Sequence, residues 1–432
     1  MNKRYLKFIG IILALSLTLP TIALSSCKND ERSESVTLPV ISINTFDGSD
    51  IQNRNVYKDM TLTVSGAAND KYNISLEGEI KGRGNSTWDF CDKKSYRIKL
   101  SEKSDLLGCG GSDRDWILLA NAREKSLLRN WAVFSLAKRM GMPYVTESTF
   151  VTLILNSEYM GVYQLCEKVE AGKHRVPIDE EWRDGDCGFL LELDRRAKNG
   201  ATPPTEYFSL EGVENPISIK SDVVSKEQNA YIKSLVDNFT RLCESGDLAA
   251  LGEIADIDSI VDMYILEDFA HDRDVGYASF FFYRERGGKI TFGAPWDFDL
   301  ALGNDTGEDQ GENFADAKGS VNHLNPWFAR LEESGEFMAL VAARFASLED
   351  EFASLRADTL DMGYKLEEEA KKNYDKWKVM GRKQLFEPFA VWIRTNYISQ
   401  VKYLCSWMEK RRDYLSERYG EYLSSNETKG RS

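Results

Sequence analysis

The sequence predicts an α+β fold of two lobes, in which a β-rich first lobe is followed by a mainly helical second lobe. Segments with alternating or β-branched apolar residues fill residues 38–194 and are typical of strands. Amphipathic helical periods dominate from residue 226 onwards. The intervening residues 195–220 are rich in Pro, Thr, Asn and Glu. This change of texture predicts a lobe boundary near residue 195.

The N-terminus has the pattern of an export signal. A basic head precedes an apolar run that ends in the lipobox-like sequence LSSC. We expect residues 1–26 to be a lipoprotein signal peptide that is cleaved before Cys27, whose thiol then carries the lipid. The polar residues 27–37 would form a short tether. The sequence thus predicts a bacterial lipoprotein of the cell envelope, anchored to the membrane on its extracytoplasmic side.

The net charge of the chain excludes some classes of binding partner. The formal net charge is −14 at pH 7, and cleavage of the signal peptide would remove only positive charges. A surface this acidic argues against nucleic acid as the partner. After the signal peptide, no apolar run is long enough to span a bilayer.

The cysteines give no metal signature. None of those beyond Cys27 lies in a CxxC pair, and the three histidines are widely spaced. We expect either one or two structural disulfides or buried thiols. The residues concerned are Cys91, Cys109, Cys166, Cys187, Cys243 and Cys405.

The first lobe is predicted to contain one helix among its strands. Glycines and polar turns separate the strand-like segments, and apolar positions between Lys125 and Met140 keep a helical period that Gly141 ends. The expected order is strands within 38–100 and at 116–120, a helix at 125–140, and strands at 150–155, 160–165 and 189–193.

The second lobe, residues 195–325, is predicted to carry a catalytic loop and a hairpin between helices. Its polar, acidic segment at 303–325 has little periodicity, which suits a mobile loop beside a site. The expected order is a loop with short strand pieces at 195–220, helices at 226–243 and 256–269, a hairpin at 279–292, a helical part of the same lobe at 326–423 and a frayed tail at 424–432.

Two acidic pairs flank the predicted hairpin. A hairpin brings its two ends together, so we expect these four carboxylates to converge on one spot. Converging carboxylates serve a metal ion, a proton transfer or both. The four residues are Asp272, Asp274, Asp297 and Asp299.

A glycine loop and a cationic strand in the first lobe could meet an anion. In KGRGNSTW, two glycines let the backbone approach closely while Arg83, Asn85 and Ser86 offer donors, so the segment is either a phosphate cradle or a bare hairpin turn. In KKSYRIKL, period-two alternation puts Arg97 and Lys99 on one face. These side chains either point toward bound phosphates or are simply exposed to solvent.

Acidic residues at later strand ends are candidate partners for that cation. Glu167 ends the strand GVYQLCE, and Glu192 and Asp194 follow in LLELD. We expect Glu167 to be the partner, with the other two as alternatives.

The acidic segment follows the order that protein kinases use for phosphoryl transfer: a helix, an acidic loop, a hairpin and an acidic turn. Apolar residues of the preceding helix would fix Asp274, and the rings of Trp296 and Phe298 would hold Asp297 still. A structural calcium or capping role for these acids remains the alternative.

These residues lie in blocks that resemble the CotH (spore coat protein H) kinase family, over approximately residues 38–305. The blocks are RGNSTW, KKSYRIKL, WILLAN with EKSLLRN, NSEYMGVYQLCEKV, GFLLELD and WDFDLALGN. The resemblance implies an atypical protein kinase fold, ATP with Mg²⁺ or Mn²⁺, and phosphorylation of Ser or Thr on extracytoplasmic proteins.

The resemblance also implies roles for individual residues. Asp274 matches the catalytic-loop aspartate, and Asp297 matches the metal-binding aspartate, with Asp299 beside it. The segment HDRDVGYAS departs from the ordinary kinase loop because it lacks an asparagine four or five places after Asp274, so a second metal site is not implied. The residues carried over for binding the nucleotide are Arg83, Asn85, Ser86, one of Arg97 and Lys99, and Glu167.

Two other functions fit the same residues. The first is a catalytically silent, lipid-anchored surface protein that binds protein or glycan and holds a structural Ca²⁺ at the acidic cluster, because ATP is scarce outside the cytoplasm. The second, a metal-dependent hydrolase, has no supporting His or nucleophile motif. The sequence leaves the substrate and the oligomeric state open.

Overall fold

The structure is a computed structural model that describes residues 33–199, 203, 206–223 and 225–429. The predicted signal peptide and Cys27 lie outside the described residues. Within the described ranges, no helix combines the length and the apolar character needed to cross a membrane. The described part is a mixed α+β fold with ten α-helices and a seven-stranded barrel.

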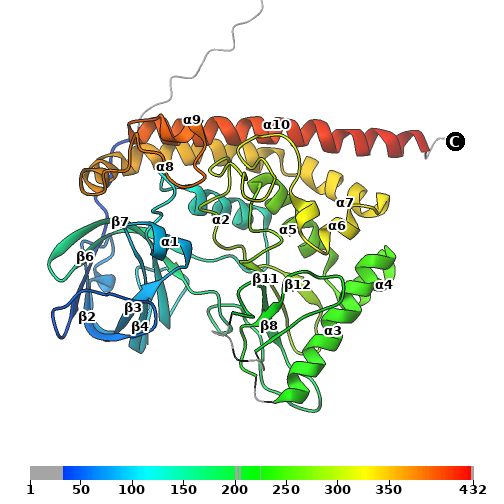
Figure 1. The fold of residues 1–432 in the computed structure, drawn as a ribbon, viewed down its shortest axis with the longest axis horizontal. Coiled ribbons are helices and arrows are strands. Elements are labelled where there is room, and N and C mark those ends of the chain that lie inside the picture. Colours follow the sequence, from blue (N-terminus) through cyan, green and yellow to red (C-terminus); the bar gives the residue numbers. More distant parts are fainter. Residues whose placement is uncertain (1–32, 200–202, 204–205, 224, 430–432) are drawn as a thin grey trace, which may run out of the picture.

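The first half of the chain forms the closed barrel, in the order β1-β2-β3-β4-β5-β7-β6 (Figure 1). Neighbouring strands are antiparallel except for β1 and β6, which pair in parallel and close the barrel. The strands are β1 (Val40–Thr45), β2 (Lys58–Ser65), β3 (Ser75–Arg83), β4 (Ser95–Ser104), β5 (Asp113–Leu119), β6 (Ser148–Leu155) and β7 (Glu158–Glu167).

Period-two alternation gives the barrel its own core. On β4, Tyr96, Ile98 and Leu100 are buried, whereas Arg97 and Lys99 face the other way. On β7, Tyr163 points into the barrel core, while Val162 on the opposite face packs into the larger core of the helical half. The predicted alternation of β4 is therefore confirmed.

Two helices interrupt the barrel strands. The short α1 (Ser86–Phe90) follows the glycine loop, so this segment is not the bare hairpin turn considered as an alternative. The predicted helix appears as α2 (Arg129–Met140), and Gly141 ends it in the left-handed conformation with φ 76°. The apolar face of α2 belongs to the core of the helical half and not to the barrel core.

A second sheet, in the order β12-β11-β8-β10-β9, lies in the helical half. The predicted hairpin is present, because Phe282 of β11 pairs with Phe292 of β12. β8 pairs with β10 and β11, so this strand, which we expected in the first lobe, is part of the second sheet. The strands are β8 (Phe189–Leu193), β9 (Tyr207–Phe208), β10 (Ile217–Ile219), β11 (Phe280–Arg284) and β12 (Ile290–Phe292).

Helices cover this sheet and extend the molecule. The structure adds α4, which the sequence analysis missed, and divides the helical part predicted at 326–423 among α6 to α10. The helices are α3 (Lys226–Ser245), α4 (Leu248–Ile254), α5 (Ile257–Ala270), α6 (Phe328–Leu331), α7 (Gly335–Ala346), α8 (Glu349–Lys376), α9 (Phe389–Trp392) and α10 (Tyr397–Lys429).

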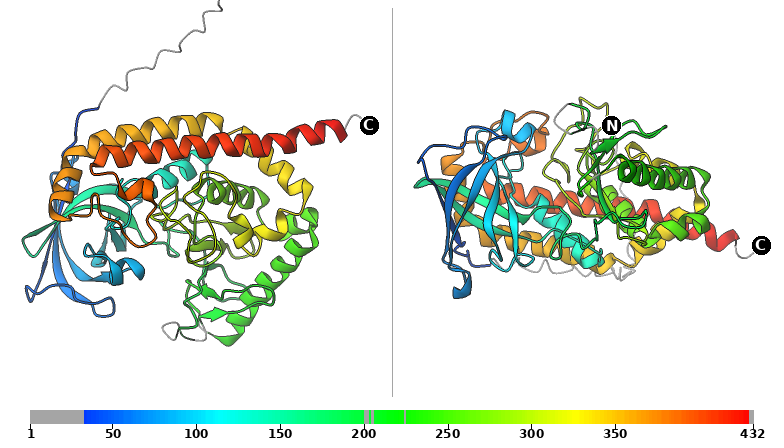
Figure 2. Two further views of the ribbon diagram at one scale, coloured as in Figure 1. Left: turned by 45° about the horizontal axis from the view of Figure 1, so that its top comes forward. Right: turned by 90° about the horizontal axis from the view of Figure 1, so that it is seen from below.

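The long helices α8 and α10 run side by side along one face of the molecule (Figures 1 and 2). The end of α8 is tied to the barrel, since Asn373 Oδ1 accepts from the Val162 nitrogen at 3.2 Å and Trp377 donates to the Met160 carbonyl at 2.8 Å. These contacts connect the barrel to the helical half. A correspondence of the two halves to kinase lobes stays a prediction.

Candidate active site

The end of α5 sets the position of Asp274. His271 ends the helix in the left-handed conformation with φ 51°, and the chain then turns sharply, so that the Asp274 carbonyl accepts from the Tyr277 nitrogen at 2.8 Å. Gly276 is required in this turn, because a Cβ atom there would lie 1.9 Å from the Leu324 carbonyl oxygen. The Asp274 side chain stays 28% exposed, whereas Asp272 is buried.

Aromatic rings fix the second acidic turn, as the sequence predicted. Trp296 and Phe298 are both buried and pack on Phe134 of α2, with ring centroids 6.1 and 6.4 Å away. Asp297 between them adopts φ 70°. Its carboxylate is thereby held at the surface of a rigid aromatic cluster.

Two asparagine side chains support the same turn. Asn130 Oδ1, in the first turn of α2, accepts from the Phe298 nitrogen at 2.8 Å. Asn304 Nδ2 donates to the Asp299 carbonyl at 2.7 Å and to the Arg123 carbonyl at 2.9 Å. The first half of the chain therefore supports the turn directly through Asn130 and, through Asn304, by the Arg123 carbonyl.

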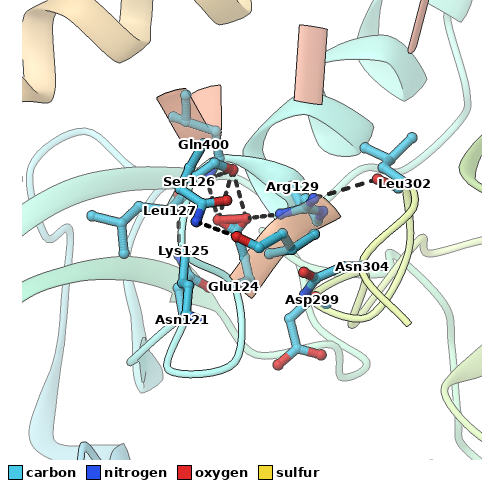
Figure 3. A network of polar contacts seen from close by, with 12 residues as sticks. Asn121, Glu124, Lys125, Ser126, Leu127, Arg129, Asp299, Leu302, Asn304 and Gln400 are labelled. Carbon is cyan, nitrogen blue, oxygen red and sulfur yellow. Dashed lines mark hydrogen bonds and ion pairs between the residues drawn. The ribbon is translucent and has the colours of Figure 1, made fainter. Parts of the chain in front are cut away.

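A buried ion pair between Arg129 and Glu124 lies next to this turn, and Figure 3 shows it near Asp299. Arg129 pairs with Glu124 at 2.8 Å and donates to the Ala301 carbonyl at 3.0 Å. The Glu124 carboxylate also accepts from Ser126 and from the Leu128 nitrogen. This fully hydrogen-bonded network rigidifies the segment after Asp299.

Three of the four predicted acids meet the glycine loop in one cavity of about 520 Å³, whereas the buried Asp272 is not part of its lining. Its lining combines Asp274, Asp297 and Asp299 from the second half of the chain with cations and hydrogen-bond donors from the barrel. The predicted barrel residues that reach it are Arg83, Asn85, Ser86 and Arg97. The expected convergence of acids opposite basic groups is thus present in the structure.

Arg83 connects the barrel to the acidic turn. It is the last residue of β3, and its guanidinium lies over the Trp296 ring at 5.0 Å from the centroid. The following Gly84 adopts φ 96°, and Arg54 donates to its carbonyl at 2.8 Å and to Asn85 Oδ1 at 3.1 Å. The loop is held open by these contacts, with Ser86 beginning α1.

The two cations of β4 have different surroundings. Arg97 lines the cavity and pairs with Asp115, with nitrogen-to-oxygen distances of 2.5 and 2.8 Å. Lys99 is exposed and is not part of the cavity lining. Of the two alternatives, only Arg97 is placed where it could contact a ligand in this cavity.

Glu167 does not pair with the β4 cation, so this part of the sequence prediction is wrong. Its carboxylate is buried against Arg175 at 2.7 Å and accepts from the Glu147 nitrogen at 2.8 Å. Burial raises the pKa of Glu167 to about 7, although Arg175 opposes the shift. Arg175 comes from the loop after β7, which the strand pattern alone could not place.

Lys220, which the sequence analysis missed, is a cation of the cavity lining that pairs with two acids of the same lining. It lies 2.7 Å from Glu192 and 3.5 Å from Asp194, and Lys220 and both acids line the cavity. Glu192 also accepts from the Ser279 nitrogen at 3.0 Å, which ties this pair to the segment just before β11. A lysine directly after the apolar strand ISI was the available sequence signal.

The acids around the cavity repel one another. Burial raises the pKa of Asp274 to about 6, and repulsion from Asp297 is the next cause. The same two causes raise the pKa of Asp299 to about 8. Burial raises the pKa of Glu267 to about 8 and that of Asp272 far above its usual value. Arg273, 4.0 Å from Asp274, and Arg123 oppose the pKa shifts of Asp274 and Asp299, respectively, without cancelling them.

A cation would relieve this repulsion, and carboxylate oxygens are the ligands that Mg²⁺ and Mn²⁺ prefer. Asp272 Oδ1 and Glu267 Oε2 are buried without a hydrogen-bond partner. Asp297 and Asp299 face the cavity and fit the role of ligands. In the part of the chain that the structure describes, no group of three or more His, Cys, Asp or Glu residues is close enough to form a metal site by itself.

A second cavity of about 360 Å³ adjoins the first and shares Arg83, Arg97 and Lys220 with it. Both cavities share Phe281 and Trp296, and the second adds apolar surface from Ile117 and Val169. It also adds positive charge from Arg54, Lys81 and Lys168. Together the two cavities offer apolar surface beside charged groups.

Within the described ranges, no disulfide joins the six remaining cysteines. Five of them are buried and Cys91 is half-buried. Of the two expectations, the structure agrees with buried thiols.

Comparison with known families agrees with this site. The family model described as CotH kinase protein matches residues 80–415, which is most of the chain. The chain belongs to the CotH kinase family. A comparison with curated proteins found no match. The predicted resemblance is confirmed, and the family assignment suggests a kinase.

Proposed function

We propose that the chain is a kinase that transfers the γ-phosphate of ATP to Ser or Thr residues of exported proteins. The observation that carries the proposal is the shared cavity in which Asp274, Asp297 and Asp299 face Arg83 and Arg97. Membership of the CotH kinase family supports it. Phosphoryl transfer needs this combination, because catalysis rests on positioning and on compensating charge.

Asp274 is the proposed catalytic residue. Its carboxylate reaches the cavity from a turn fixed by α5, and it would orient the acceptor hydroxyl and receive its proton. A pKa raised to about 6 by burial and by repulsion from Asp297 makes this carboxylate a better base than an ordinary aspartate. The role therefore follows from both position and environment.

Arg83 and Arg97 are the proposed phosphate-binding cations. Arg83 stacks on Trp296 but forms no ion pair within the described ranges, so its charge is available to a ligand. Arg97 is held by Asp115 and supplies a fixed positive charge at the cavity wall. Asn85 and Ser86 add hydrogen-bond donors at the same edge.

The nucleotide would occupy both adjoining cavities. Ile117 and Val169 of the barrel half and Phe281 of the second sheet offer an apolar place for the base. The phosphates would then extend into the cavity that Asp274, Asp297 and Asp299 line. The barrel corresponds, in this proposal, to the N-lobe of an atypical kinase, and the helical half to the C-lobe.

Asp297 and Asp299 are the proposed ligands of a divalent cation, Mg²⁺ or Mn²⁺. When bound there, such a cation neutralises phosphate oxygens and the acids that hold it. Trp296, Phe298 and Asn130 keep the turn in place.

The cellular address is also a proposal. It rests on the signal-like first 26 residues and on Cys27, which would carry a lipid and anchor the protein on the extracytoplasmic side of a membrane. The substrates would then be exported proteins.

Phosphate incorporation from labelled ATP tests the reaction. Purified protein without its signal peptide is incubated with Mg²⁺ or Mn²⁺ and a cell-envelope extract. Wild type should label itself or an extract protein, whereas Asp274→Asn and Asp297→Asn should lose nearly all labelling. Asp350→Asn, the same change at an exposed position of α8, is the matched control and should keep it. Full incorporation by Asp297→Asn would overturn the metal assignment.

A thermal-shift experiment separates the kinase from the catalytically silent alternative. Stabilisation that requires ATP together with Mg²⁺ or Mn²⁺ supports the kinase, because a ligand stabilises only the state that binds it. Stabilisation by Ca²⁺ alone, with no effect of nucleotide, would contradict it.

A further inference from the structure

A separate cavity of about 660 Å³ lies between the end of α1 and the segment that follows α8. Of its lining residues, only Asn121 also lines the candidate active site. Its volume falls within the range of about 300–1,000 Å³ that small-molecule sites occupy. The proposed kinase reaction makes no use of this cavity.

The lining is strongly basic, and we call it the basic cavity. It includes one acidic residue, Asp92, although the chain as a whole carries a net charge of −14. The basic residues are Lys93, Arg123, Lys376, Lys378, Arg382 and Lys383. They come from three separate segments of the sequence, so the fold gathers this charge.

Most of these cations lack a carboxylate partner. Lys376 pairs with Glu158, and Lys378 lies 3.3 Å from Asp375. The other four form no ion pair within the described ranges. The positive charge of the cavity is therefore largely uncompensated.

Arg123 is the buried cation of the cavity. It is only 7% exposed, its guanidinium donates to the Leu385 carbonyl, and it forms no ion pair within the described ranges. A carbonyl group satisfies a hydrogen bond but brings no net negative charge, so burial of this cation costs free energy that a bound anion would offset. Lys93 is only 4% exposed, and its Nζ donates to the carbonyls of Ala120 and Val162. Burial lowers the pKa of Lys93 well below its usual value, so Lys93 adds little positive charge to the cavity.

We propose that the basic cavity is a binding site for a small anion with several negative charges, of the diphosphate or polyphosphate class. Arg123 and Arg382 can each bind two phosphate oxygens with their planar guanidinium groups, and Lys383 adds a mobile point charge. Enclosure by α1, the end of α8 and the following loop favours a compact ligand. This site is distinct from the nucleotide cavity and does not depend on the proposed kinase activity.

Isothermal titration with inorganic pyrophosphate, without metal ions, tests the proposal. Arg382→Ala/Lys383→Ala removes two exposed charges of the basic cavity with little risk to folding. Lys402→Ala/Lys410→Ala removes the same charge from exposed positions of α10 and is the matched control. Arg83→Ala reports binding in the candidate active site instead.

Wild type and the α10 control should bind pyrophosphate alike, and Arg83→Ala should keep the binding that the basic cavity provides. The Arg382→Ala/Lys383→Ala protein should bind about tenfold more weakly or worse, because two charge-assisted contacts are lost. The proposal is overturned if wild type does not bind, if the α10 control weakens binding equally, or if binding disappears only in Arg83→Ala. Circular dichroism of each variant confirms that the loss is not unfolding.

Discussion

The side-chain oxygen of Asn130 accepts a hydrogen bond from the main-chain nitrogen of Phe298 at 2.8 Å. Phe298 separates Asp297 from Asp299, and Asn130 lies in the first turn of α2, well over a hundred residues earlier. The geometry of the acidic turn is thus set by a helix from the other half of the chain. Asn130 also donates to Asn121 Oδ1 at 3.2 Å, which fixes its amide orientation.

Asn130→Ala should destabilise the protein and weaken its response to metal and nucleotide. The change leaves the buried Phe298 nitrogen without an acceptor, which costs about 1–3 kcal/mol. Urea denaturation measures the stability, and thermal shift with Mg²⁺ and ATP measures the response. Asn313→Ala, at an exposed position, is the control. Unchanged stability and response in Asn130→Ala would show that the hydrogen bond does not position the turn.

Arg83→Ala should weaken nucleotide binding, whereas Lys99→Ala should leave it unchanged. Arg83 lines both adjoining cavities, while Lys99 is exposed on β4 outside them. Loss of a charged contact to phosphate predicts about a tenfold or greater rise in the dissociation constant. Titration with a fluorescent ATP analogue measures both variants. A larger effect at Lys99 than at Arg83 would exchange their roles.

Asp297→Asn should not lower the stability of the ligand-free protein. Asp297 is the leading charged contributor to the raised pKa values of Asp274 and Asp299, so its removal relieves repulsion. In the presence of EDTA, the melting temperature of the variant should equal or exceed that of wild type. Added Mg²⁺ and ATP should then raise the melting temperature of wild type only. A variant that melts well below wild type in EDTA would argue for a structural role.

Glu267→Gln should make stability less dependent on pH. Burial, followed by repulsion from Asp274, raises the pKa of Glu267 from 4.5 to about 8 in the folded state. The folded protein therefore holds a proton that the unfolded chain releases, and this stability, complete below pH 4.5, is lost as pH rises to about 8. The loss is at most about 1.4 kcal/mol per pH unit.

Urea denaturation of both proteins between pH 4.5 and 8, in EDTA, measures the difference. Relative to Glu267→Gln, wild type should lose stability steadily across this interval. A constant difference would mean that Glu267 ionises normally in the folded protein.

Local order in the sequence was sufficient to predict the acidic half of the site. The hairpin of β11 and β12, which turns at Gly287, brings its two flanking acids, Asp274 and Asp297, to one cavity. The helix before Asp274 and the strands of the hairpin have clear periodic patterns, so this convergence could be predicted. The alternation on β4 likewise placed Arg97 and Lys99 on one face. Such features depend on short-range geometry, which the residue pattern determines.

Long-range pairing was not predictable in the same way. Glu167 pairs with Arg175 from a loop without periodicity, and Lys220 reaches Glu192 only because β8 and β10 are neighbours in the second sheet. The residue pattern of β8 predicts a buried strand but does not indicate to which sheet the strand belongs. The local sequence pattern is the same whichever acid pairs with a given cation. The ion pairs could therefore be identified only from the structure.

The most direct test of the account is a crystal structure with Mn²⁺ and a non-hydrolysable ATP analogue. Anomalous diffraction locates the manganese without assumptions about its ligands. We predict a peak bound to the Asp297 carboxylate and within reach of Asp299, with phosphates between it and Arg83, and with Asp274 facing the terminal phosphate. Manganese bound elsewhere, or a nucleotide absent from this cavity while present at another site, would contradict the account.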